Sequence, residues 1–217
     1  MTRRGRIGLK VGVWAGCLAP LAALGWWAWA AELTANPISF ITNWLGDWTL
    51  RLLLLSLSMT PLRLLFGFSW PVALRRLLGL FAFAYASLHF TVWLVVDHLF
   101  DWPEMGRDIL KRPYVTIGML ALTLLVPLAA TSTAGMIRRL GGTAWRRLHR
   151  LAYAAGVAAI LHFLWLAKVG RTEPYYYAAW LGLALGVRGW AALRRRFLRR
   201  ATARPSPVEK VARLQPQ

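Results

Sequence analysis

The chain has 217 residues, of which 58% are hydrophobic, and it carries 13 Trp and a formal net charge of +19. A composition this apolar excludes an ordinary soluble domain. Its single cysteine, Cys17, excludes an internal disulfide, an all-cysteine iron–sulfur site and a cysteine-rich zinc site, and no glycine-rich loop offers a standard NAD or ATP motif.

Six apolar segments are long enough to cross a bilayer, because about 20 apolar residues span its hydrocarbon core as a helix. In chain order they are residues 11–31, 48–65, 77–96, 113–130, 151–167 and 175–193. The first has no good cleavage site, so we expect it to remain as a span. The sequence therefore predicts an all-α integral membrane bundle of six helices over residues 11–193. A basic segment, 1–10, precedes it, and a basic tail, 194–217, follows and is expected to be disordered.

The charges alternate along the connectors between these spans. Segments 1–10, 62–76, 131–150 and 194–217 carry four, three, five and eight Lys or Arg, against one acidic residue, Glu209. The other connectors carry seven carboxylates against five Lys or Arg. The positive-inside rule then places both termini in the cytoplasm. The basic excess thus indicates topology and attraction to anionic lipid, and it does not indicate nucleic-acid binding.

Two histidines lie deep within predicted spans, where an ionisable side chain is costly and needs a reason. His89 lies 13 residues beyond Arg76, and His162 lies 12 residues beyond Arg150 on a span that runs the same way. At about 1.5 Å per residue, both reach about 20 Å from the basic side. Facing imidazoles at matched depth suit an axial pair for haem iron. Hydrogen bonds to neighbouring helices are the structural alternative.

A third histidine, His149, lies just before the fifth span, at its basic end. The residues 13 and 14 positions before His89, which could have supplied its partner, are Arg76 and Arg75. Arginine is a poor metal ligand but a good partner for propionate or phosphate. The sequence therefore predicts an inner haem with unusual ligation, or a flavin or quinone site. That site would be formed by His149, Arg75, Arg76 and Arg147; a plain interfacial role for His149 stays open.

Other polar residues have structural readings. We expect His98 to be an interface residue and Arg188 to extend toward the headgroups from a span end. The acidic connector, which carries Asp97, Asp101, Glu104 and Asp108, is expected to be a solvated loop, with docking of a basic partner as the alternative. No Ser-His-Asp set or paired carboxylates lie at membrane depth, so hydrolytic chemistry is not indicated.

Several motifs together carry a family resemblance over residues 11 to about 196. They are Asn36-Pro37, Gly46-Asp47-Trp48, Thr60-Pro61-Leu62-Arg63, Arg75-Arg76-Leu77-Leu78-Gly79-Leu80, Tyr85, Leu88-His89, Lys111-Arg112-Pro113-Tyr114, Gly118, Thr131-Ser132, Trp145-Arg146-Arg147-Leu148-His149-Arg150-Leu151, Tyr153 and His162. The chain resembles the MsrQ family, also called YedZ. These proteins are haem-binding membrane subunits of the protein-methionine-sulfoxide reductase system, within the ferric-reductase-like transmembrane group.

The resemblance implies a multi-pass protein of the bacterial inner membrane with one or two b-type haems, for which His89, His149 and His162 match the family's histidines. It also implies FMN, electrons from the quinone pool, and a periplasmic molybdenum-containing subunit that repairs oxidised methionines. Relatives with two haems have His pairs on both helices, and this chain departs from them at positions 75 and 76. A ferric reductase with another acceptor and a non-redox membrane scaffold are the alternatives.

Overall fold

A computed structural model describes residues 3–167 and 170–202, and these residues are almost entirely helical. The part of the predicted disordered tail beyond residue 202 lies outside the described residues. The elements, in chain order, are α1 (Arg3–Trp29), α2 (Pro37–Phe66), α3 (Trp70–Thr91), the π-helical turn η1 (Val92–Asp97), α4 (Trp102–Lys111), α5 (Pro113–Ala130), α6 (Ala134–Leu148), α7 (Leu151–Leu166) and α8 (Glu173–Thr202). The predicted all-α class is confirmed.

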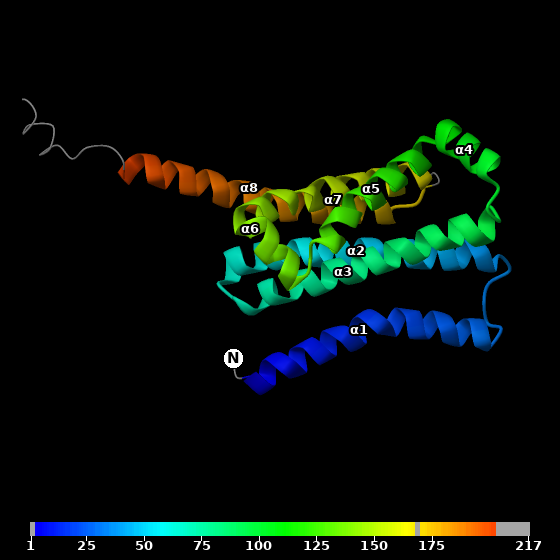
Figure 1. The fold of residues 1–217 in the computed structure, drawn as a ribbon, viewed down its shortest axis with the longest axis horizontal. Helices are drawn as coiled ribbons and strands as arrows, with labels where there is room; N and C mark the ends of the chain where they lie inside the picture. The colour runs from blue at the N-terminus through cyan, green and yellow to red at the C-terminus, as the bar shows by residue number, and fades with distance from the viewer. Residues whose placement is uncertain (1–2, 168–169, 203–217) are drawn as a thin grey trace, which may run out of the picture.

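The long helices lie side by side and alternate in direction (Figure 1). Helices α1, α3 and α7 run one way, and α2, α5 and α8 return. The short helix α4 lies at one end of the bundle, which we call the acidic end because Asp101, Glu104 and Asp108 are there. Helix α6 lies toward the opposite, basic end, where α1 also starts and α8 ends.

Four described segments are long and apolar enough to cross a membrane on their own, namely Ile7–Trp29, Pro37–Phe66, Trp70–Asp97 and Pro113–Ala130. A fifth candidate is the pair Ala134–Leu148 and Leu151–Leu166, which is bent by 43°. Helix α8 does not reach the same length-and-hydropathy standard, although it runs the length of the bundle. The sixth span and the cytoplasmic termini therefore stay predictions.

The segments between the predicted spans also contain helix, which is why the described residues contain eight α-helices. Helix α2 starts at Pro37, well before the predicted residue 48, because Asn36 caps it: its side-chain oxygen accepts from the Ser39 N–H at 3.1 Å. The acidic connector is not a loop, since Asp101 caps α4 in the same way through Glu104 N–H at 3.0 Å. Helix α8 continues past residue 193 to Thr202, so the tail begins as helix.

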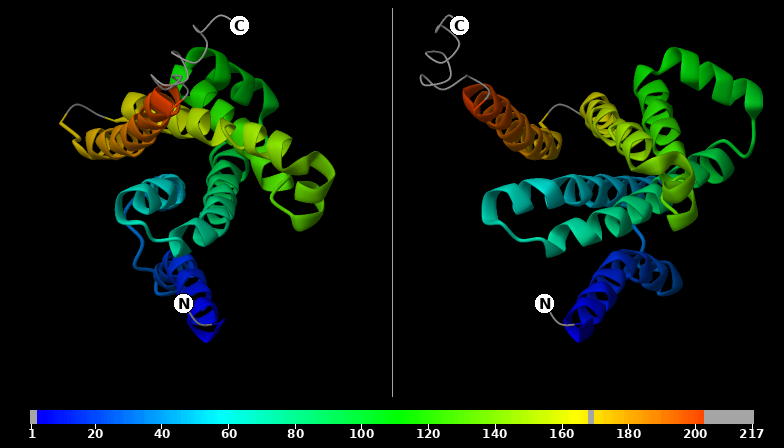
Figure 2. Two further views of the ribbon diagram at one scale, coloured as in Figure 1. Left: turned by 90° about the vertical axis from the view of Figure 1, so that its left-hand side faces the viewer. Right: turned by 60° about the vertical axis from the view of Figure 1, so that its left-hand side comes forward.

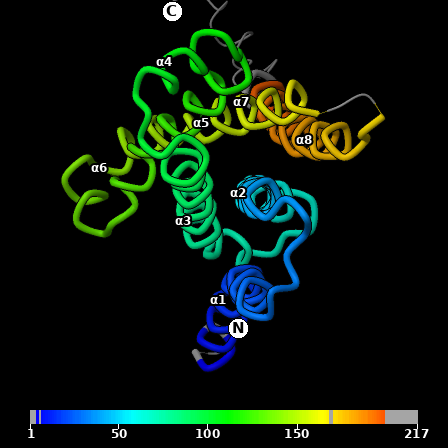
Figure 3. The backbone as a smooth tube through the Cα atoms, turned by 90° about the vertical axis from the view of Figure 1, so that its right-hand side faces the viewer, coloured from blue at the N-terminus to red at the C-terminus, as the bar shows by residue number. Residues whose placement is uncertain are grey.

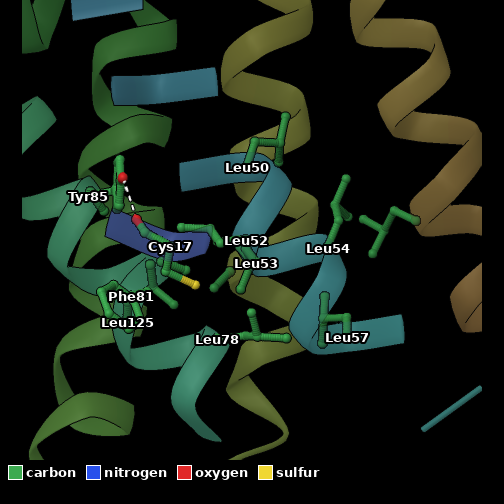
Figure 4. Packing of buried hydrophobic residues seen from close by; sticks show 14 of the residues in the cluster. Cys17, Leu50, Leu52, Leu53, Leu54, Leu57, Leu78, Phe81, Tyr85 and Leu125 are labelled. Atoms are coloured by element: carbon green, nitrogen blue, oxygen red, sulfur yellow. Dashed lines mark hydrogen bonds between the residues drawn. The ribbon is translucent and has the colours of Figure 1, made fainter. Parts of the chain in front are cut away.

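Two antiparallel helix pairs build the centre of the bundle. Helix α2 packs along α3, and α5 packs along α7. Leucines of α2 fill the space against α3, where Tyr85 is completely buried (Figure 4). Helix α1 lies on the far side of this pair from α5, α7 and α8 (Figures 2 and 3). It is held by hydrogen bonds from Tyr85 Oη to Cys17 O at 2.7 Å and from Trp44 Nε1 to Pro20 O at 3.1 Å.

The outward faces of the long helices are apolar. Trp29 on α1 is 79% exposed and Leu183 on α8 is 71% exposed, and many other large hydrophobic side chains share this position. A soluble monomer rarely exposes so large an apolar surface. Such faces fit contact with lipid. The few buried polar groups line the interior of the bundle.

Candidate functional site

A cavity of about 560 Å³ lies between the two helix pairs. Four parts of the chain contribute to its walls: residues 36–53 at the start of α2, residues 86–97 of α3 and η1, residues 112–125 at the start of α5, and residues 159–166 of α7. Of these, Asn36 and Arg112 directly precede their helices. Toward the basic end the walls are apolar, with Leu50, Leu53 and Leu125 among them. Toward the acidic end they are polar. A largely apolar cavity between helices with a few convergent polar groups is the usual form of a cofactor site.

His89 on α3 and His162 on α7 both line this cavity. Their ring centres are 6.2 Å apart, and the ring planes are inclined at 85°. The sequence placed the two imidazoles at matched depth on parallel-running helices, and the structure brings them together there. Both residues are partly buried.

Each imidazole is oriented by a backbone carbonyl of the neighbouring helix. His89 Nδ1 lies 2.8 Å from Thr42 O, and His162 Nδ1 lies 2.7 Å from Tyr114 O. Because a carbonyl can only accept, Nδ1 carries the hydrogen in both rings. The lone pair is therefore on Nε2, which is the arrangement that orients most metal-ligating histidines.

One helical turn after each of these carbonyl residues, a glycine leaves room for the imidazole ring. A Cβ on Gly46 would lie 3.2 Å from Cε1 and Nδ1 of His89. A Cβ on Gly118 would lie 2.8 Å from Nδ1 of His162, closer than carbon and nitrogen can approach without displacement. The spacing of four between Thr42 and Gly46 recurs between Tyr114 and Gly118. Both helix pairs thus use the same device to seat a histidine.

The separation of the two imidazoles can be compared with that of an axial pair. With metal–nitrogen bonds of about 2 Å and about 1 Å from Nε2 to the ring centre, the two ring centres would be roughly 6 Å apart. The observed 6.2 Å fits this value. In the part of the chain that the structure describes, no three His, Cys, Asp or Glu side chains group closely enough to hold a metal ion. The donors present therefore match a metal that is held by two imidazoles together with a macrocycle.

The polar mouth of the cavity holds an ion-pair network. Arg112 Nη1 lies 3.1 Å from Asp108 Oδ2, and His98 Nε2 lies 3.1 Å from the same oxygen. His98 is buried beneath α4, with its ring against Trp93, and so it is not the interface residue that the sequence suggested. Sequence reasoning did not assign a role to Arg112; its place directly before Pro113, at the start of α5, was the available signal.

The residues predicted for an inner site lie toward the basic end and do not line the cavity. His149 lies in the break between α6 and α7 and is therefore not part of a continuous helix with His162. Its ring stacks on Trp145 at 3.8 Å, Nδ1 lies 3.0 Å from Trp145 O, and Nε2 lies 3.5 Å from Ser132 Oγ. Arg75 lies near enough to interact electrostatically with His149, whereas Arg76 and Arg147 are exposed. A ligand role for these residues stays a prediction.

Arg188 does not extend to the headgroups as expected. Its guanidinium packs over the Tyr153 ring at 5.1 Å, with Nη1 2.5 Å from Tyr153 Oη and Nη2 donating to Leu57 O. It thereby ties α8 to α7 and α2. Its Nε is buried and has no hydrogen-bond partner within the part of the chain that the structure describes. The sequence could not show this, because position along a span does not reveal which side of the helix faces protein.

A known family and several known proteins resemble this chain over most of its length. A family described as "Ferric reductase like transmembrane component" matches residues 11–160, a stretch that contains His89 and His149 and ends just before His162. A protein of Rhodospirillum rubrum named "Protein-methionine-sulfoxide reductase heme-binding subunit MsrQ" is 49% identical over 193 residues, covering 89% of this chain and 92% of its own. Proteins of the same name from Ralstonia nicotianae and Xanthomonas campestris are 45% and 47% identical, covering 84% and 92% of this chain and 85% and 93% of theirs.

Proposed function

Because the chain belongs to the MsrQ family of ferric-reductase-like membrane proteins, we propose that it carries electrons on haem b for a methionine-sulfoxide reductase. It is a multi-pass bacterial membrane protein. The acceptor of the proposed pathway is a periplasmic, molybdenum-containing catalytic subunit, and the donor is the quinone pool. Haem binding and the reductase partnership are supported by the names of its relatives, and the donor and the molybdenum rest on the family resemblance alone.

The pairing of His89 and His162 carries the proposal. The two imidazoles face each other across a largely apolar cavity, and each has Nδ1 bonded to a carbonyl, which directs both Nε2 lone pairs away from those carbonyls. Packing alone does not require that arrangement. A bound haem supplies one-electron chemistry at its iron. The protein holds the ligands at fixed orientation through Thr42 and Tyr114, and the leucine walls keep water from the site.

The direction of transfer follows from the proposed topology. Six passes with both termini in the cytoplasm would place the basic end inside and the acidic end outside. The alternating helix directions and the common end of the start of α1 and the end of α8 support this arrangement (Figure 1). Residues 11–193 then form the membrane domain, between cytoplasmic segments 1–10 and 194–217. The His89–His162 pair lies toward the outer half, near a periplasmic acceptor.

A second cofactor belongs at the basic end in this proposal. FMN or a second haem would lie near His149 and Arg75, with Arg76 and Arg147 toward its anionic groups. The closeness of Arg75 to His149 supports the grouping. The α3 positions that could have paired with His149 are arginines in this chain, so the proposed inner site does not rest on a histidine pair.

The first experiment is a reduced-minus-oxidised visible spectrum of the detergent-purified protein, with haem measured per chain. We expect a b-type spectrum that is lost in His89→Ala and in His162→Ala, although both variants insert and run as the parent does in gel filtration. His149→Ala is the informative companion, because it should keep this spectrum and lose only a second haem, if one is bound. Full haem retention in His89→Ala would refute the axial assignment.

The proposed acceptor is tested separately. The reduced haem should be reoxidised when the oxidised catalytic subunit of a methionine-sulfoxide reductase is added. Reoxidation by ferric chelates alone would favour a ferric reductase instead. A colourless, folded protein that takes up no haem on reconstitution would favour the non-redox scaffold.

A further inference from the structure

The walls of the cavity change in character along the bundle axis. Below the histidine pair, toward the basic end, the lining is Leu50, Leu53, Ala121, Leu122 and Leu125. At the acidic end the lining includes Asn36, Ser39, Asn43, Asp97 and Arg112. The proposed ligand is itself two-sided, with an apolar macrocycle and two carboxylates on one edge. The orientation that leaves no charge in the apolar part turns these carboxylates toward the acidic end.

Arg112 is the only Lys or Arg among the described residues that line this cavity. It stands two residues before Tyr114, whose carbonyl orients His162, so the guanidinium and the ligating ring are positioned by the same end of α5. The other charged groups in the lining are the carboxylates of Asp47 and Asp97. An anionic ligand group would be repelled by both, and Arg112 is the cation that can offset this repulsion.

We propose that the guanidinium of Arg112 binds the carboxylates of the haem, and that Asp108 and His98 hold it at the mouth of the cavity. This inference rests on the proposed function, and it assigns a specific ligand contact that the axial histidines do not require. It also fixes which edge of the macrocycle faces the acidic end.

The contacts around Arg112 hold its guanidinium in position. Nη1 lies 3.1 Å from Asp108, and among the described residues no other partner of the guanidinium is found, so the other N–H donors of the planar fork remain for a ligand carboxylate. Asp108 has only 14% of its side chain exposed and is also bound by His98 Nε2 at 3.1 Å. His98 is fixed in turn through Nδ1, which lies 3.2 Å from the carbonyl of Trp93, another residue of the cavity lining. The side chain of Arg112 is 53% exposed, so a carboxylate at the mouth can reach it.

The test compares haem with its dimethyl ester, which lacks the charged carboxylates but keeps the macrocycle and iron. Full-length protein produced under haem limitation is titrated with each compound, and the ratio of the two dissociation constants is measured for each variant. In the parent protein we expect haem to bind about tenfold more tightly than the ester, which is typical of a charge-assisted hydrogen bond. In Arg112→Gln the ratio should fall to about one. Because the ratio is taken within a single variant, a general loss of stability cancels.

Matched variants separate a direct contact from a structural effect. Arg112→Lys should keep part of the preference for haem, because it keeps the charge without the fork. Arg107→Gln on α4 removes an exposed cation that does not line the cavity, and its ratio should equal that of the parent. Asp108→Asn should lower the ratio less than Arg112→Gln does, if its role is positioning. An undiminished preference for haem in Arg112→Gln, or none in the parent, would overturn the proposal. Failure of the parent to bind either compound would instead refute the proposed function.

Discussion

Replacing Gly118 with alanine should displace His162 and weaken haem binding. The added Cβ would lie 2.8 Å from Nδ1 and 3.0 Å from Cε1 of His162. Ordinary van der Waals contact is about 3.5–4 Å, so the ring or α5 must move by roughly 0.5–1 Å. The ring cannot simply rotate away, because Nδ1 is bonded to Tyr114 O at 2.7 Å, one turn before the substituted residue on the same helix.

Two contributions set the size of the effect. Overpacking in a tight interior costs about 1–3 kcal/mol. Loss of the hydrogen bond at Nδ1 costs about 1–3 kcal/mol, because the group stays buried. If the protein relaxes so that only one of these two costs remains, that cost is about 1–3 kcal/mol, which corresponds to a loss of haem affinity of roughly 5-fold to 150-fold.

The assay is titration of haem into the purified apo-protein, with the dissociation constant taken from the b-type absorbance. Gly182→Ala is the matched control, since nothing lies within 4 Å of a Cβ at that position of α8. It should bind haem as the parent does. Equal haem affinities in Gly118→Ala and Gly182→Ala would refute the argument that the glycine makes room for an axial ligand.

Three other substitutions have graded expectations. Gly46→Ala places a Cβ 3.2 Å from the His89 ring, a less severe contact than in Gly118→Ala, so the haem affinity should fall by only about threefold to tenfold in the same titration. A larger loss than in Gly118→Ala would contradict the idea that the shorter contact has the larger effect. Tyr85→Phe removes the 2.7 Å hydrogen bond to Cys17 O and should destabilise the fold by about 1 kcal/mol in SDS-induced unfolding, with haem per folded chain unchanged. Arg188→Lys keeps the charge but lacks the planar fork whose two terminal nitrogens donate separately to Tyr153 and Leu57, so the free energy of unfolding should fall by about 1–2 kcal/mol. An unchanged unfolding midpoint would show that the fork contributes nothing.

Much of the architecture could be predicted because a membrane constrains sequence so strongly. Apolar stretches must be helical when no water is present to satisfy the backbone, so hydropathy alone located the long helices. The predicted fourth span coincides with α5, Pro113–Ala130. The capping residues Asn36 and Asp101 are readable in the sequence, and they explain why α2 begins before residue 48 and why the acidic connector is helical.

The site was accessible to sequence reasoning only in part. The depth of His89 and His162 follows from counting residues along helices of fixed rise, and it predicted that they could meet. Their tautomers, the carbonyls of Thr42 and Tyr114, and the glycines that admit the rings depend on which helix faces which. That information is not in the periodicity of one segment.

What the sequence by itself determined is therefore one-dimensional: helical class, the depth of each histidine, and the charge asymmetry between the two ends. The tertiary structure alone decided lateral placement. It put His89 and His162 6.2 Å apart, drew Arg188 inward to Tyr153, and set Arg112 at the mouth of the cavity while leaving His149 outside its lining. The physical reason is that the rise per residue fixes where a residue lies along an apolar helix. The rotation of each helix and its choice of neighbours are fixed instead by packing between helices, all of which present similar apolar surfaces to lipid.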